Sequence, residues 1–165
     1  TEMNIRGQND IRVVNGEAAC RINFLWPKNL ELAQTDQFDP PPRPRIKLVE
    51  YHLTATTRAS TRSRTFVTVL RPYRSNESMD EEAKFYTADS GYAVRIPMKA
   101  GHAIVLLQAE AGRRFSAAGL ETDADVAAAV FGMDGTMRGT FVTPGKEILL
   151  AESDGTLNSN GDRQN

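Results

Sequence analysis

Short runs with the two-residue alternation of β-strands recur along this chain of 165 residues, and turn signals separate them. About ten such runs can be distinguished, and almost no stretch has helical periodicity. This spacing is typical of an antiparallel stack of sheets. We therefore expect an all-β fold, an antiparallel β-sandwich of about ten short strands, in a single domain over residues 1–152 with a disordered tail over residues 153–165.

The clearest strand lies between Arg64 and Tyr73. Its residues are apolar or β-branched on both faces, which predicts a central strand that is covered on both sides. Pro72 is expected to end it, because proline cannot donate a hydrogen bond to a neighbouring strand. The expected partner is the run from Ile46 to Thr57, joined to it by the basic segment 58–64.

A hairpin is predicted near the N-terminus, after a polar segment of ten residues that we expect to fray or to form a sheet edge. The strand Ile11–Val14 is followed by Asn15-Gly16, a pair that favours a tight turn with positive φ. The returning strand Glu17–Trp26 alternates, and this predicts a half-buried strand. Its two faces carry Cys20, Ile22, Phe24 and Trp26 on one side and Arg21 and Asn23 on the other.

Two long polar stretches interrupt the strands. Residues 29–45 include four prolines between Pro40 and Pro44, and we expect an extended loop there. Residues 74–82 are polar and acidic and predict a solvated loop.

Strand patterns resume at Ala83 and continue to Ala151. We interpret residues 120–126 as a loop that enters the strand Val126–Phe131. An Asp-Gly pair in residues 132–136 predicts a hairpin turn, and Pro144-Gly145 is expected to join the last two strands, 137–143 and 146–151, to each other.

Four pieces in a fixed order carry a resemblance to a known family. They are a strand that ends in proline (Phe24–Pro27), a proline-rich loop, the run Tyr51-His-Leu-Thr-Ala55, and the strand Arg64–Pro72. The series resembles the C-terminal β-sheet region of the heparinase II/III-like polysaccharide lyases. It covers residues 11 to 75, and a weaker similarity continues to about residue 150.

That resemblance implies a parent enzyme that cleaves uronate-containing polysaccharides by β-elimination. The catalytic residues of the family lie mainly on a helical toroid, with a further histidine and often a metal in a central β-domain. No residue of this chain matches a catalytic motif of the family, so we expect no catalytic residue, metal or cofactor here. The chain is expected to be a C-terminal piece of such a lyase, with the toroid and the central β-domain as partners and a periplasmic or secreted location.

General composition excludes several other classes. A net charge of −1 gives the whole chain no electrostatic preference for nucleic acid, and no apolar run is long enough to span a membrane. The single cysteine, Cys20, excludes an internal disulfide and is interpreted as a small buried side chain. The two histidines, His52 and His102, lack metal-ligand spacing.

Charge is nevertheless distributed unevenly. Residues 43–74 hold eight basic side chains against one acid, Glu50, for a local net charge of +7, and residues 75–90 have a net charge of −4. The basic set is Arg43, Arg45, Lys47, Arg58, Arg62, Arg64, Arg71 and Arg74. Arginine forks bind carboxylate and sulfate groups through paired hydrogen bonds. The candidate substrate-binding residues for an anionic polysaccharide are Arg58, Arg62, Arg64, Tyr51, His52 and Tyr73.

Three functions fit these observations. An accessory lyase domain predicts an apolar sheet face where other domains pack. A free-standing carbohydrate-binding module predicts a closed apolar surface with a basic or aromatic groove. A structural domain without a ligand predicts that the arginines are solvated, or paired with the acidic segment 77–82.

Overall fold

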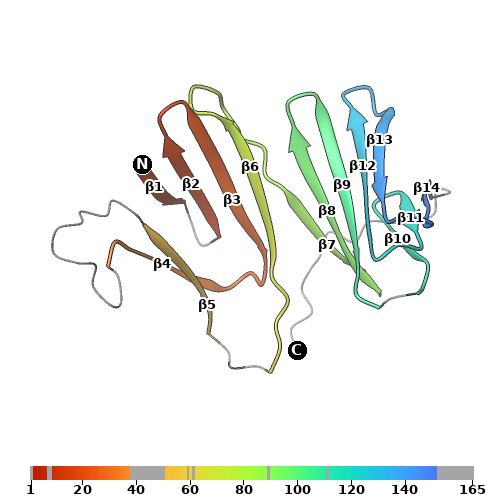
Figure 1. Ribbon diagram of the computed structural model, residues 1–165, viewed down its shortest axis with the longest axis horizontal. Coiled ribbons are helices and arrows are strands. Elements are labelled where there is room, and N and C mark those ends of the chain that lie inside the picture. The colour runs from red at the N-terminus through yellow and green to blue at the C-terminus, as the bar shows by residue number, and fades with distance from the viewer. Residues whose placement is uncertain are drawn as a thin grey trace. The chain divides into compact units, whose positions relative to one another are not determined.

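The computed structural model describes residues 2–6, 9–37, 51–58, 60, 62–88, 90–110 and 112–151. Within these residues it contains fourteen strands and no helix, and every strand pair is antiparallel (Figure 1). The all-β class predicted from the sequence is confirmed. The described part of the chain therefore offers no helix that is long and apolar enough to cross a membrane.

The chain divides into two compact units, Thr1–Asp80 and Glu81–Asn165, where the sequence predicted a single domain. The expected tail, residues 153–165, lies outside the described residues. Residues 38–45, which hold all four prolines of the expected loop 29–45, lie outside them as well.

The first unit contains a four-stranded sheet and a separate strand pair. The sheet has the order β1-β2-β3-β6 and the pair is β4-β5. Their bounds are β1 Glu2–Arg6, β2 Asp10–Asn15, β3 Ala18–Trp26, β4 Leu30–Thr35, β5 His52–Thr57 and β6 Val67–Arg74. The expected hairpin joins β2 and β3, and Gly16 has the positive φ of 60° that its turn requires.

Strand β6 differs from the prediction in three ways. It lies at the edge of the sheet and pairs with β3. Of the expected partner, residues 46–57, residues 46–50 lie outside the described residues, and β5 pairs with β4. It is not covered on both sides, because Val67 and Val69 are buried while Leu70 is 62% exposed. Pro72 does not end it, because an edge strand can turn the donor-free side of proline away from its neighbour.

The burial of the two faces of β3 is the reverse of what their hydrophobicity suggests, because the more polar face is the buried one. Ala19, Arg21 and Asn23 are buried, whereas Cys20, Ile22, Phe24 and Trp26 are only partly buried. Arginine and asparagine are buried here because they form a hydrogen-bonded network with Asp10 and Arg71, described below. Strand β4 was missed, since residues 29–45 were interpreted as one loop.

The second unit contains a five-stranded sheet of order β13-β12-β9-β8-β7 and a three-stranded sheet of order β10-β11-β14 (Figure 1). The bounds are β7 Lys84–Ala88, β8 Gly91–Met98, β9 Gly101–Gln108, β10 Phe115–Ala117, β11 Leu120–Thr122, β12 Val126–Gly132, β13 Met137–Val142 and β14 Ile148–Leu150. Most of these strands follow the predicted positions. Residues 120–126 are an exception, because they begin with β11 rather than forming a loop.

The core of the second unit lies between its two sheets. Phe115 and Leu120 of the small sheet are 1% and 0% exposed and pack with Leu106 and with small residues of β8 and β12. Those small residues, Ala93, Ala127 and Ala129, leave room for the aromatic ring. Two sheets packed face to face in this way give the unit a sandwich-like core.

The last strand pairs differently from the expectation. Residues 143–146 do turn, with Gly145 at a φ of 80° and the Lys146 amide donating to the Thr143 carbonyl at 3.0 Å. Strand β14 then pairs with β11 and not with β13. The turn therefore carries the chain from the large sheet to the small one.

Candidate functional site

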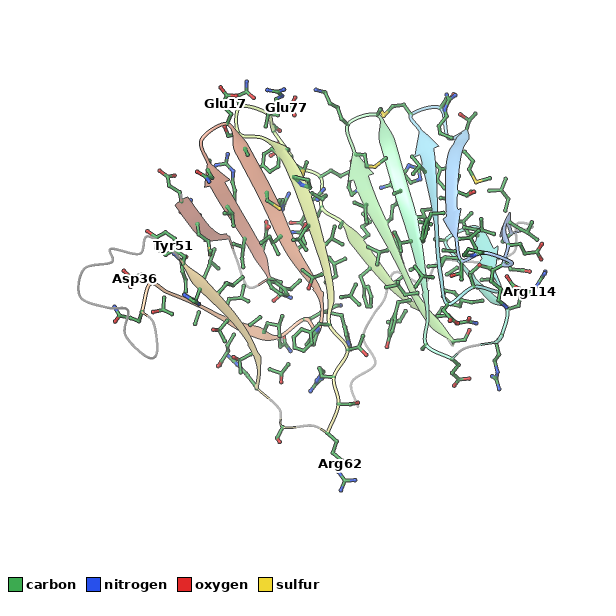
Figure 2. All side chains as sticks on the ribbon, viewed as in Figure 1. Glu17, Asp36, Tyr51, Arg62, Glu77 and Arg114 are labelled. Carbon is green, nitrogen blue, oxygen red and sulfur yellow. The ribbon has the colours of Figure 1, made fainter. Side chains whose placement is uncertain are left out.

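The three candidate arginines lie on and beside the connection between β5 and β6. Arg58 follows the end of β5, and Arg62 and Arg64 precede β6. All three are exposed, and Figure 2 shows Arg62 extending from the end of this connection. We call this segment, residues 58–64, the basic connection.

Arg58 is already paired. Its Nε donates to Glu31 Oε1 at 2.9 Å, and the two side chains are 74% and 59% exposed. An exposed pair of this kind is worth up to about 1 kcal/mol, so a stronger anion can displace the glutamate. Neither Arg62 nor Arg64 forms an ion pair with any residue in the part of the chain that the structure describes.

Tyr51 and His52 do not join these arginines. In the β4–β5 pair, His52 lies opposite Thr35 while Thr57 lies opposite Leu30, so His52 and Arg58 are at opposite ends of β5. Six strand residues span about 20 Å at a rise of roughly 3.3 Å per residue. Figure 2 places Tyr51 beside Asp36, far from Arg62.

Tyr73 also lies away from the basic connection. It stands near the far end of β6, opposite Ala19 of β3. Its hydroxyl accepts a hydrogen bond from Arg12 Nε at 2.8 Å, and the guanidinium carbon of Arg12 lies 6.0 Å from the centre of its ring. The six predicted residues are therefore spread over three places, and only the arginines share one.

The other basic residues of the stretch 43–74 do not lie with the basic connection either. Arg43, Arg45 and Lys47 lie outside the described residues. Arg71 is buried at 5% exposure, and Arg74 ends β6 at the other end of the sheet from Arg64. The net charge of +7 read from the sequence is thus not one continuous surface among the described residues.

A buried polar network that the sequence analysis missed lies on one face of the first sheet. The carboxylate of Asp10 accepts from Arg21 Nη2 at 2.7 Å and from Asn23 Nδ2 at 3.1 Å. Arg71 Nη2 donates to Asn23 Oδ1 at 3.0 Å. A charged residue between apolar ones, as Arg71 is between Leu70 and Pro72, was the sequence signal for such a network.

His102 is a structural residue in the second unit. Its ring stacks on Phe131 with centres 5.1 Å apart and planes 13° apart. Burial and then the nearby charge of Arg95 lower its pKa below the usual value of 6.5, and Glu81 opposes this shift. Among the described residues there is no group of three or more His, Cys, Asp or Glu side chains arranged to hold a metal ion.

The outward side of the five-stranded sheet is apolar. One register row across it is Phe85, Val94, Val105, Ala128 and Phe141, and these alternate with the residues that face the core. Val94 is 2% exposed, whereas Phe141 and Val126 on β13 and β12 are 66% and 40% exposed. A sheet that is apolar on both faces is typical of one with covers on both sides. We call this side the outer face.

Comparison of the chain with family models, with curated proteins and with solved structures gave no match. The resemblance to polysaccharide lyases stays a hypothesis from the sequence.

Proposed function

We propose that the chain is a non-catalytic β-sheet module of a heparinase II/III-like polysaccharide lyase. In this role it packs against the catalytic domains of the parent enzyme and contacts the anionic polysaccharide with the arginines of the basic connection. The β-elimination itself is assigned to the toroid and the central β-domain, and no step of it is assigned to residues 1–165.

The proposed contact with polysaccharide rests on the exposure of Arg62 and Arg64. Two guanidinium groups, two residues apart and without an ion pair in the described residues, can each donate paired hydrogen bonds to a carboxylate or sulfate group. Arg58 adds a third cation once Glu31 is displaced. Tyr51, His52 and Tyr73 remain candidates for separate contacts along a long chain molecule.

The outer face supports a packing role over a free-standing binding module. A monomeric module predicts a closed apolar surface, whereas Phe141 and Val126 on this side are 66% and 40% exposed, beside an apolar row in which Val94 is buried. Exposed apolar surface of this kind is characteristic of docking surfaces. In the proposed parent enzyme, a neighbouring domain covers this side.

Retention on immobilised heparin, measured over a salt gradient, tests the proposed contact. The test variant is R62A/R64A, and the matched control is R74A/R113A, which removes the same charge from exposed arginines elsewhere. Each exposed arginine contact is worth up to about 1 kcal/mol, so the double variant is expected to bind about 5- to 30-fold more weakly. The control is expected to elute close to the wild type.

Two outcomes would overturn the proposal. Equal losses in both variants would mean that the protein responds to total charge and not to the basic connection. Absence of retention of the folded wild-type protein on heparin and on a non-sulfated uronate polymer would favour the structural domain without a ligand.

A further inference from the structure

Arg21 of β3 joins two parts of the first unit that are far apart in sequence. Its Nε and Nη2 atoms hold the carboxylate of Asp10 at 2.7 to 3.1 Å. Its Nη1 atom points the other way and donates to the backbone carbonyls of Met79 at 2.7 Å and Asp80 at 3.3 Å. Side-chain exposures of 11% for Arg21 and 17% for Asp10 show that this arrangement is largely removed from water.

Asp10 and its neighbours hold the guanidinium in one orientation. The two-pronged contact fixes the plane of the guanidinium group, because both prongs must reach one planar carboxylate. Asn23 donates to the same carboxylate and accepts from Arg71, so the acceptor is itself held in place. A single rotamer of Arg21 is thereby selected with its third nitrogen directed at residues 79–80.

The segment that Arg21 holds lies at the boundary between the two compact units in the chain, because the first unit ends at Asp80 and the second begins at Glu81. The segment is held at its start as well. The Ser75 amide donates to the Glu17 carbonyl at 2.8 Å, and Arg12 Nη2 donates to the Ser75 carbonyl at 3.3 Å. Arg12 lies directly opposite Arg21 in the β2–β3 register, so neighbouring arginines of one row bind the two ends of residues 75–80.

We propose that Arg21 is a positioning residue that fixes the course of the chain as it leaves the first unit. A polar, acidic stretch of this composition is ordinarily a solvated loop, and junctions between compact units are ordinarily flexible. Here two backbone carbonyls next to the junction are bound by a guanidinium that a buried carboxylate orients. This inference goes beyond the proposed function and does not depend on any polysaccharide.

Limited digestion with a glutamate-specific protease tests the proposal in the full chain. Glu81 and Glu82 lie directly after the residues that Arg21 binds, and Glu110 is an exposed reference site in the second unit. The test variant is R21K, since lysine can pair with Asp10 but lacks the fork that also reaches residues 79–80. Cleavage at Glu81 or Glu82 is expected to be at least tenfold faster in R21K, with cleavage at Glu110 unchanged.

Hydrogen exchange separates a positioning role from a general loss of stability. In R21K the amides of residues 80–82 are expected to exchange at least tenfold faster, while those of β2 and β3 keep their protection. R58K, a matched change at an exposed pair of the same unit, is expected to change neither measurement. Wild-type cleavage and exchange rates in R21K would overturn the proposal, and so would a parallel loss of protection across β2, β3 and the junction.

Discussion

Replacement of Phe115 by alanine is expected to lower the stability of the second unit more than any other single truncation in its core. The ring is 1% exposed and lies between the two sheets with Leu106 and Leu120. An aromatic side chain buries at least about 150 Å², and at roughly 25 cal/mol per Å² its loss corresponds to about 4 kcal/mol. Since the neighbours are small and held in strands, the cavity will not close fully, and we expect a loss of about 3–5 kcal/mol.

Native-state hydrogen exchange is the suitable assay for F115A, because it reports the free energy of opening for each segment. The expected loss should appear in the amides of β8, β9 and β12, which line the same core. L150A is the matched control, since Leu150 belongs to the same small sheet but is 61% exposed, and a change within about 0.5 kcal/mol is expected. A shift below about 1 kcal/mol for F115A, or equal shifts in both variants, would refute the described packing.

Three further predictions concern other parts of the molecule. G91A should destabilise the second unit by about 1–3 kcal/mol in urea unfolding, because the added Cβ would overlap the Leu107 carbonyl oxygen. G139A adds a Cβ in open space and should cost less than about 0.5 kcal/mol, so similar unfolding midpoints for the two variants would contradict this prediction. Because folding lowers the pKa of His102, the folded state favours the neutral imidazole, and stability should fall as the pH drops below about 6.5. H102Q should weaken this fall, and a pH profile identical to that of the wild type would contradict a role of His102 in it. R58A should change stability by less than about 1 kcal/mol, because its pair with Glu31 is exposed, and a larger loss in thermal unfolding would show that the pair is structural.

Local signals in the sequence predicted much of the second unit. Glycine and proline turns with alternating runs between them placed β8, β9, β12 and β13 near their observed positions. Short turns with their own residue preferences join β8 to β9 and β12 to β13. Pairing between distant segments could not be obtained in this way. The partner of β14 is β11, and both strands bring an apolar side chain to the core, Leu120 from β11 and Ile148 from β14, which the turn at Gly145 does not specify.

The first unit shows why the candidate site was only partly predictable. Hydrophobic alternation identified β3 correctly but could not show that Arg21 and Asn23 are buried, since their burial depends on Asp10 and Arg71 in other strands. The six candidate residues are close in sequence, yet β5 pairs with β4 and β6 pairs with β3. Only Arg58, Arg62 and Arg64 remain together, because they belong to one connection.

The central claim is that the basic connection binds anionic polysaccharide. Its most direct test is a titration of the wild-type protein and of R62A/R64A with a uronate polysaccharide at low and at moderate salt, beside a neutral dextran of the same length. The account predicts saturable binding to the uronate polymer that weakens as salt rises, since exposed charges are screened, and no binding to dextran. Equal binding of the wild type to both polymers, binding to neither, or unchanged binding by R62A/R64A would contradict it.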